Sequence, residues 1–357
     1  MQLTIQQEQC IKTIQELYHQ KQKIITIAGV AGSGKTTIVP YIIDTLKLWD
    51  NVAFVTYTGK ASLVLRQKGI PATTIHHLIY DCKKIGWDTY IFTLKPEISK
   101  KIKLIIIDEI SMVPKELLID LLKFNRPIIT FGDHCQLEPV GEDNGLLKHP
   151  DFILTEVIRQ AEDNPIIYLS KLIREEKFAY INTEQLKVLS PKDFDYSMIN
   201  WADQCICGYN NTRQVINNNM RYYLYNSNYK YPQIGDKLIS LKNYWDRVDS
   251  QNNPLINGAL YTVKNSKFSN YKLECKLEDI DTHAIFEKIN INSTIFLGRQ
   301  GKTKYPIFDY GYAITVHKAQ GSEWNKILII DEQMPNYHKW LYTALTRAKE
   351  ECIIIKQ

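Results

Sequence analysis

Gly29-Val-Ala-Gly-Ser-Gly34-Lys35-Thr36 decides the fold of this 357-residue chain, because it fits the pattern GxxxxGK[ST]. It stands directly after the short apolar run 23–28, whose length and β-branched residues predict a buried strand. Glycines in such a loop let backbone N–H groups turn inward around phosphate oxygens, and the helix that follows adds the positive end of its dipole. The sequence therefore predicts a nucleotide site between a strand and a helix.

The side chains of this loop suit a nucleotide that carries a metal ion. The Lys35 ammonium would neutralise the β- and γ-phosphates, and the Thr36 hydroxyl would ligate Mg²⁺. We expect the nucleotide to be held by Gly29, Gly32, Ser33, Gly34, Lys35, Thr36 and Thr37.

A second motif, Leu104-Ile-Ile-Ile-Asp108-Glu109, is an apolar strand that ends in two carboxylates. Ligands of parallel α/β sheets bind at the carboxyl ends of the strands, so both acids are expected beside the phosphate loop. Asp108 can hold the metal, and Glu109 can polarise the attacking water. The two motifs together predict hydrolysis of a nucleoside triphosphate rather than binding alone.

Short apolar runs alternate with helical stretches over the rest of the chain, which predicts parallel α/β structure. We expect two domains, at 1–150 and 151–357. Short segments in which apolar and polar residues alternate, separated by turn residues, predict a small antiparallel β insertion at 229–305. The expected strands of the α/β parts are 23–28, 52–56, 104–107, 128–131, 204–207, 310–313, 326–330 and 352–355, with a helix at 211–225; those of the insertion are 237–241, 259–263, 272–277 and 283–288.

Composition excludes several classes of protein. No apolar run approaches the ~20 residues that cross a bilayer, and the N-terminus lacks the basic start and apolar stretch of a secretory signal. Seven cysteines without metal-binding spacing predict free thiols in a reducing cytoplasm. The net charge of +5 allows a polyanionic partner without demonstrating one.

Six further motifs occur in a fixed order: TYTGKA at 56–61, TTIHHL at 73–78, GDHCQLEPV at 132–140, LTEVIRQ at 154–160, AITVHKAQGSE at 313–323 and YTALTRAK at 342–349. With this set the chain resembles superfamily 1 helicases of the 5′→3′ branch, of the RecD and Dda type. The resemblance implies two RecA-like domains with ATP and Mg²⁺ between them and single-stranded DNA across their tops. It also implies a β-hairpin insert at 83–103 in the first domain and an SH3-like subdomain at 229–305 in the second.

The resemblance assigns roles at the ATP site. Gln7 would read adenine, and Glu323 would meet the ribose. Gln136 would sense the γ-phosphate, and Arg159 and Arg347 would act as arginine fingers. With Lys35 and Glu109, these last three form the expected catalytic set. Glu138 departs from the family pattern, in which proline is commonest.

The resemblance also assigns residues that would contact single-stranded DNA. The expected DNA contacts are Thr58, Lys60, His76, His77, Asn210, Thr315, His317 and Lys318, with only one of the two histidines touching DNA. Trp87 and Phe92 join them, because the 83–103 insert carries six lysines against two acids with aromatic residues between them. Such a segment suits a pin that splits duplex, since aromatics stack on bases while lysines follow phosphates. Alternatively, the aromatics simply pack beneath a basic hairpin.

We therefore expect a monomeric, ATP-dependent DNA helicase that moves 5′→3′ in replication, repair or recombination. Single-stranded DNA and duplex junctions are the expected partners, with single-strand-binding or replisome proteins beside them. Three alternatives remain open: a translocase that strips proteins from single strands, an RNA helicase of the same superfamily, and an assembly module whose ATPase acts as a timer.

Overall fold

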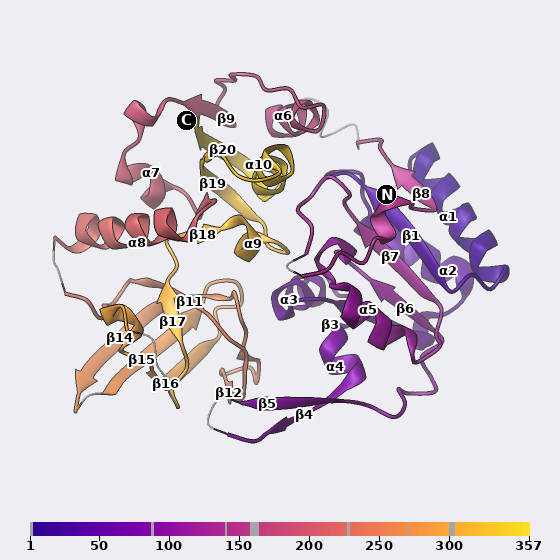
Figure 1. Cartoon of the computed structure of the whole chain (residues 1–357), viewed down its shortest axis with the longest axis horizontal. Helices are drawn as coiled ribbons and strands as arrows, with labels where there is room; N and C mark the ends of the chain where they lie inside the picture. Colours follow the sequence, from indigo (N-terminus) through magenta and orange to yellow (C-terminus); the bar gives the residue numbers. More distant parts are fainter. Residues whose placement is uncertain are drawn as a thin grey trace.

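The computed structural model describes residues 3–86, 89–139, 141–157, 164–226, 229–270, 272–299 and 304–357. Its architecture is mixed α/β, with two parallel sheets and one antiparallel sheet (Figure 1). Among the described residues, no helix has both the length and the apolar character needed to cross a membrane.

The first parallel sheet contains six strands in the order β3-β2-β6-β7-β1-β8. These are β1 (Ile24–Gly29), β2 (Val52–Thr56), β3 (Ala72–Thr74), β6 (Leu104–Ile107), β7 (Ile128–Gly132) and β8 (Phe152–Leu154). Its helices are α1 (Ile5–His19), α2 (Val39–Leu46), α3 (Gly59–Gln67), α4 (Ile75–Ile79) and α5 (Lys115–Leu122), with short 3-10 turns η1 (Thr36–Ile38), η2 (Trp49–Asn51), η3 (Ile110–Met112) and η4 (Leu146–Lys148). Separate apolar clusters pack against the two faces of the sheet, which explains why its strands are continuous apolar runs.

The second parallel sheet has the order β18-β10-β19-β20-β9. Its strands are β9 (Leu186–Leu189), β10 (Gln204–Cys207), β18 (Ala313–Thr315), β19 (Trp324–Ile330) and β20 (Ala348–Ile355). The helices around it are α6 (Pro165–Arg174), α7 (Tyr196–Trp201), α8 (Asn210–Tyr225), α9 (Val316–Ala319) and α10 (Tyr337–Leu345), with η6 (Pro191–Asp193) before α7.

An antiparallel sheet is inserted between α8 and β18, at the lower left of Figure 1. It comprises β11 (Lys237–Ser240), β14 (Leu260–Ser269), β15 (Lys272–Asp279), β16 (Ile285–Ile291) and β17 (Phe308–Tyr310), accompanied by the pair β12 (Tyr244–Val248) and β13 (Pro254–Leu255) and the turn η7 (Ile295–Leu297). A separate hairpin, β4 (Tyr80–Lys84) with β5 (Tyr90–Leu94), extends from α4 towards β12.

Four expected boundaries need correction. β8 pairs with β1, so the first sheet continues beyond residue 150. The hairpin spans 80–94 rather than 83–103, because Tyr80 already pairs with Leu94 at its base. The segment 310–313 is not one strand: β17 joins the insertion and β18 joins the second parallel sheet. The insertion sheet therefore ends at Tyr310 rather than at 305.

Gly311 explains why the chain changes sheets at this point. A Cβ atom there would lie 2.8 Å from Leu260 Cδ2 and 3.1 Å from the Leu238 carbonyl carbon. The backbone therefore crosses tightly against the insertion, which only glycine permits.

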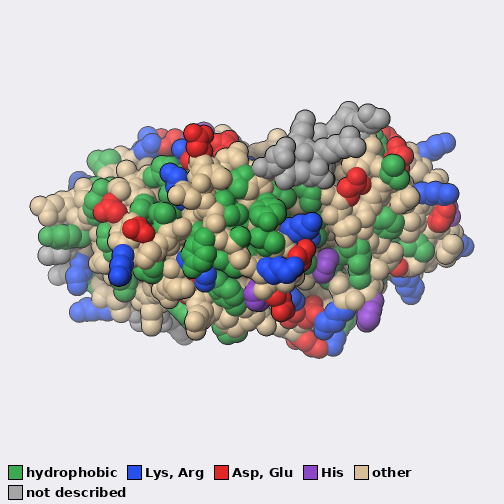
Figure 2. All heavy atoms as spheres, turned by 90° about the horizontal axis from the view of Figure 1, so that it is seen from above, with side chains coloured by type: hydrophobic (Ala, Val, Ile, Leu, Met, Phe, Trp, Pro, Cys, Tyr) green, Lys and Arg blue, Asp and Glu red, His purple; other side chains and the backbone are tan. Residues whose placement is uncertain are grey.

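The surface seen from above mixes charges of both signs. In Figure 2, Lys and Arg side chains are interspersed with Asp and Glu side chains. The net charge of +5 is therefore not collected into a single broad patch on that face.

Candidate nucleotide site and strand-facing surface

The phosphate loop leaves β1 and turns directly into η1. Gly32 and Gly34 have φ angles of +79° and +73°, a conformation that L side chains rarely adopt. Gly29 is needed for space, because a Cβ there would lie 2.7 Å from Ser33 Oγ. The Lys35 ammonium folds back on the loop, donating to the carbonyl oxygens of Gly29 at 2.6 Å and Val30 at 3.0 Å.

Gln7 lies against this loop from the first turn of α1. It forms a capping box with Thr4, and its Nε2 donates to the Ser33 carbonyl oxygen at 3.1 Å. Its Oε1 accepts from the Thr4 N–H at 3.1 Å, so both ends of the amide already bond within the chain. The neighbouring Gln6 instead holds the segment after β8, accepting from the N–H groups of Thr155 and Glu156.

The two acids after β6 lie at the adjacent strand end. Burial raises the pKa of Asp108, while the Lys35 charge and, more weakly, a hydrogen bond from the Thr36 hydroxyl lower it. A hydroxyl beside a carboxylate offers the oxygen ligands that Mg²⁺ prefers, so Thr36 and Asp108 fit the expected metal. Glu109 has a left-handed backbone, with φ of 55°, where the chain turns from β6 into η3.

Arg347, in the turn between α10 and β20, brings charge from the second domain to these acids. Burial raises the pKa of Glu109, and the strongest opposing influence is the Arg347 guanidinium. Arg347 is 4% exposed, and its Nε donates to the Thr343 carbonyl oxygen at 3.0 Å. Glu323 is exposed, with a carboxylate oxygen 3.6 Å from Lys349 Nζ. The other expected finger, Arg159, lies outside the described residues.

A tyrosine that we did not predict as a site residue joins the two sheets. The Tyr342 hydroxyl accepts from the Ala31 N–H of the phosphate loop at 2.9 Å and donates to Asp133 Oδ2 at 2.6 Å. Tyr342 is 1% exposed and Asp133 is fully buried. Burial and the Asp133 carboxylate both raise the pKa of Tyr342, so its hydroxyl stays protonated. Its place in the YTALTRAK motif was the available signal, but a sequence does not say what the hydroxyl meets.

The loop after β7 adds further contacts across the same interface. The Leu137 N–H donates to Thr343 Oγ1 at 2.9 Å, and Gln320 Nε2 donates to the Leu137 carbonyl oxygen at 3.2 Å. Glu138 pairs with Lys339 on α10 at 2.9 Å, which gives its departure from the family pattern a local partner. The buried Oε1 of Gln136 has no hydrogen-bond partner within the described part of the chain.

On the first domain, the residues expected to contact DNA lie in two different environments. Thr58 caps α3, accepting from the Ala61 N–H at 3.2 Å. Lys60 is 6% exposed rather than open: its ammonium lies 3.3 Å from Asp281 of the insertion and 5.0 Å from the Trp324 ring centroid. Lys60 is therefore committed to an interdomain contact in this arrangement.

His76 and His77 differ in exposure, and the contact of one of them with DNA stays a prediction. His77 is exposed, whereas His76 is half-buried among the rings of Tyr57, Tyr80 and Phe92, at centroid distances of 6.1, 5.7 and 6.0 Å. Burial lowers the pKa of His76. Phe92 is 45% exposed, and Trp87 lies outside the described residues.

The hairpin closes a cavity of about 520 Å³ against the insertion. Lys84 Nζ lies 2.7 Å from Asp246 Oδ2, and the Tyr90 hydroxyl donates to Asp246 Oδ1 at 2.9 Å. Cys82, opposite Phe92 on the hairpin, is exposed.

On the second domain, the residues expected to contact DNA gather at the carboxyl ends of β10 and β18. Thr315 is 9% exposed and His317 is exposed. Lys318 Nζ donates to Asn257 Oδ1 at 2.8 Å, and burial, then the Arg213 charge, lower the pKa of Lys318. Asn210 opens α8 and accepts from Arg213 Nε at 3.2 Å.

Glu332 is a second residue that the sequence did not single out. One of its carboxylate oxygens accepts from the N–H groups of Gly208 and Tyr209, at 2.5 and 3.0 Å, at the start of α8. A carboxylate at a helix N-terminus satisfies free N–H groups and complements the helix dipole. Glu332 thus fixes the backbone that presents Asn210.

A family model described as an AAA domain matches residues 2–194, which is more than half of the chain. The chain belongs to this AAA family. In this AAA protein, residues 310–355 also match a UvrD-like helicase C-terminal domain, a range that contains β18, α9, β19, α10 and β20.

Curated relatives of this AAA protein confirm the resemblance to RecD- and Dda-type helicases. The ATP-dependent RecD2 DNA helicase of Deinococcus radiodurans is 27% identical over 92% of this chain and 46% of its own length. The ATP-dependent DNA helicase dda of phage T4 is 30% identical over 50% of this chain and 44% of its own length. The chain thus spans less than half the length of these two relatives.

Solved structures show the fold. A Bacteroides Pif1 bound to single-stranded DNA superimposes with a TM-score of 0.60 at 20% identity, over 99% of this chain and 92% of that one. A Pif1 helicase from Candida albicans gives a TM-score of 0.57 at 16% identity, over 99% and 94%. The AAA protein has the mixed α/β fold of Pif1 helicases.

Proposed function

We propose that this chain is an ATP- and Mg²⁺-dependent DNA helicase that translocates 5′→3′ along single-stranded DNA and unwinds duplex. The observation that carries the proposal is the junction of the two parallel sheets at the phosphate loop. Tyr342 bonds the loop directly, and the Arg347 charge of the second domain opposes the raised pKa of Glu109. A nucleotide in the loop would therefore touch groups of both domains.

Side chains of both domains would take part in the hydrolysis of ATP. From the first, Lys35 would release the loop carbonyls and bind the β- and γ-phosphates, Thr36 and Asp108 would hold Mg²⁺, and Glu109 would orient the attacking water. From the second, Arg347 would stabilise charge on the transferred phosphoryl group. The further expected contributions are those of Gln7, Gln136, Arg159 and Glu323.

The cycle follows from this division. With ATP bound, Arg347 and the Tyr342 contacts favour the closed arrangement of the two domains, and loss of the γ-phosphate removes part of that attraction. Alternating closure would then move Thr58, His77, Asn210 and Lys318 relative to one another along a strand. Hydroxyl, amide and cationic groups suit phosphate and sugar contacts that carry no sequence information.

Strand separation is assigned to the hairpin. We propose that β4–β5 is the pin and that the antiparallel sheet is the SH3-like subdomain, because Asp246 ties one to the other. In this proposal the ring of Phe92, which is 45% exposed, would meet the first base pair. Each strand of the hairpin has only five residues, which favours the translocase as the second candidate.

The test is ATP-driven unwinding of partial duplexes that carry either a 5′ or a 3′ single-stranded tail, in DNA and RNA versions. We expect opening only from the 5′ DNA tail, and none with Lys35→Ala, which should still bind the tail. Strand-stimulated ATP hydrolysis without opening of any duplex would favour the translocase. Opening of the RNA duplexes would favour the RNA helicase, and hydrolysis that ignores nucleic acid would favour the timer.

A further inference from the structure

A second cavity, of about 590 Å³, lies between α8, η7 and β17. This volume falls in the range of roughly 300–1,000 Å³ that is typical of ligand pockets. Its cationic and aromatic lining includes Arg213, Arg221, Tyr222, Tyr229, Lys230 and Arg299. The proposed helicase cycle gives this cavity no role.

The walls of the cavity are built by paired arginines. Arg221 is buried, donates to Asp236 at 3.1 Å, and also donates to the carbonyl oxygens of Tyr229 and Tyr231. Arg213 donates to Asp309 at 2.7 Å. These pairs fix the shape of the cavity and leave the two exposed cations, Lys230 and Arg299, to give it a positive character.

The cavity continues the strand-facing surface of the second domain. Arg213 lines the cavity, and its Nε donates to Asn210 Oδ1 at 3.2 Å. Asn210 stands at the carboxyl end of β10, in the sheet that also ends in Thr315 and Lys318. A chain that passes Asn210 and continues along α8 would reach the residues of α8 that line the cavity.

Aromatic rings lie on this route. Tyr222 is 55% exposed and Tyr229 is 45% exposed, and both line the cavity. Cations for phosphates and flat rings for bases are together the features of single-strand sites, whereas an acidic peptide would need only the cations.

We propose that this cavity is a groove that extends the single-strand path beyond Asn210, adding nucleotides to the length that the protein occupies. The inference rests on the proposed single-strand binding and extends it. Bases stack on Tyr222, and Arg299 binds a phosphate.

The test measures the affinity of the full chain for labelled oligothymidylates by fluorescence anisotropy. One should be about 8 nucleotides long, enough for the main site, and one about 16, enough to reach the cavity. The variant is Tyr222→Ala with Arg299→Ala. We expect its affinity for the long oligomer to fall about 10-fold or more, with the short one bound within about two-fold of wild type. The loss of Arg299 should also reduce the salt slope for the long oligomer by about 0.7.

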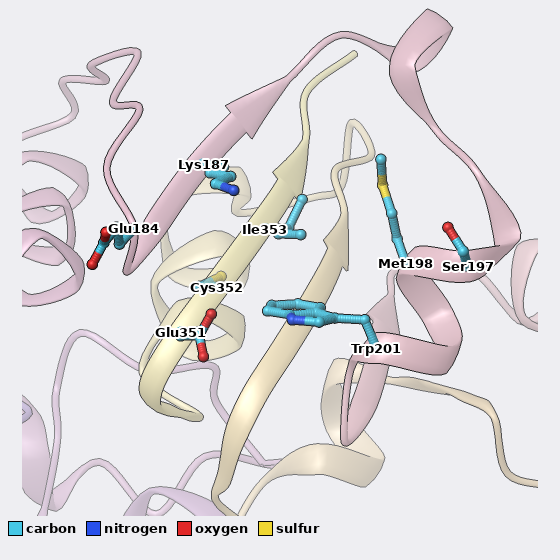
Figure 3. A pocket seen from close by; sticks show the side chains of 8 residues that line it. All are labelled: Glu184, Lys187, Ser197, Met198, Trp201, Glu351, Cys352 and Ile353. Atoms are coloured by element: carbon cyan, nitrogen blue, oxygen red, sulfur yellow. The ribbon is translucent and has the colours of Figure 1, made fainter.

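Lys187→Ala is the matched control. Lys187 is an exposed cation of the same domain, but it lines a different cavity, between β9, β20 and α7, where Trp201 points across the sheet (Figure 3). Its loss should leave both oligomers bound within about two-fold, because one surface charge away from the path adds little.

Two outcomes would overturn the groove: an unchanged affinity for the long oligomer, or an equal loss of affinity for both lengths. If wild type binds neither oligomer, the proposed function itself fails, which is a different result from a failure of the groove alone.

Discussion

The nucleotide interface and the hairpin junction both join the two halves of the molecule, but they differ in how exposed their polar contacts are to solvent. At the interface, Tyr342 and Asp133 are almost completely buried. At the junction, the side chains of Lys84 and Asp246 are 36% and 38% exposed. Losing a buried hydrogen bond to a charge costs about 1.5–3 kcal/mol, whereas an exposed ion pair contributes about 0–1 kcal/mol. The interface is therefore suited to transmit nucleotide state, and the junction to open and close.

The largest expected effect is at the interface. Arg347→Ala should reduce the kcat for ATP hydrolysis by about 10³-fold, because an arginine finger stabilises charge that develops only in the transition state. ATP affinity should change much less. Steady-state hydrolysis and nucleotide binding measure both quantities, with Lys349→Ala, an exposed cation two residues away, as the control. An unchanged kcat would refute the finger.

The next effect tests the tyrosine bridge. Tyr342→Phe keeps the ring but removes the hydroxyl between the phosphate loop and Asp133. We expect DNA-stimulated hydrolysis to fall about 10- to 100-fold, equivalent to about 1.5–3 kcal/mol. The exposed Tyr180→Phe should behave as wild type. Equal rates in the two variants would show that the bridge does not couple the domains.

A smaller effect is expected at the hairpin junction. Asp246→Ala removes the partner of both Lys84 and Tyr90, and an exposed contact of this kind contributes at most about 1 kcal/mol. Unwinding should slow by up to about five-fold while ATP hydrolysis on single strands stays unchanged. Glu287→Ala, which breaks an exposed ion pair with Lys276 in the insertion, is the control. A loss as large as that of Tyr342→Phe would contradict the contrast between the two regions.

The smallest effect concerns pH at the base of the hairpin. Burial lowers the pKa of His76 in the folded chain, so the unfolded chain binds more protons once the pH falls below about 6.5. The wild type should therefore lose stability relative to His76→Phe as the pH falls from about 6.5, until it passes the folded pKa. Thermal melting of the two proteins at several pH values measures this difference. A constant difference would mean that His76 does not titrate with unfolding.

Much of the fold was predictable because parallel strands buried on both faces are continuous apolar runs. The expected strands 52–56, 104–107 and 204–207 agree with β2, β6 and β10 to the residue. The segment 310–313 was wrong because an apolar run carries no sign of which sheet it will join. Only the close approach of Gly311 to Leu238 and Leu260 decides that the sheets change there.

The nucleotide site was predictable for a different reason. A phosphate loop and an acidic strand end are local patterns, so Lys35 and Asp108 could be placed from a few residues of sequence. Tyr342, Thr343 and Gln320 could not be placed in this way, since their partners lie more than 180 residues away in the chain. Lys60 shows the same limit: its motif predicted a contact with single-stranded DNA, and in the structure its ammonium pairs with Asp281.

The exposure of Cys82 makes the hairpin directly observable. All seven cysteines fall in the described part of the chain; five are buried, Cys135 is half-buried, and Cys82 is exposed on β4. A thiol-reactive fluorophore should therefore attach first to the hairpin of the unaltered protein. Its emission would then report, in real time, whether the hairpin moves against the insertion as ATP is turned over.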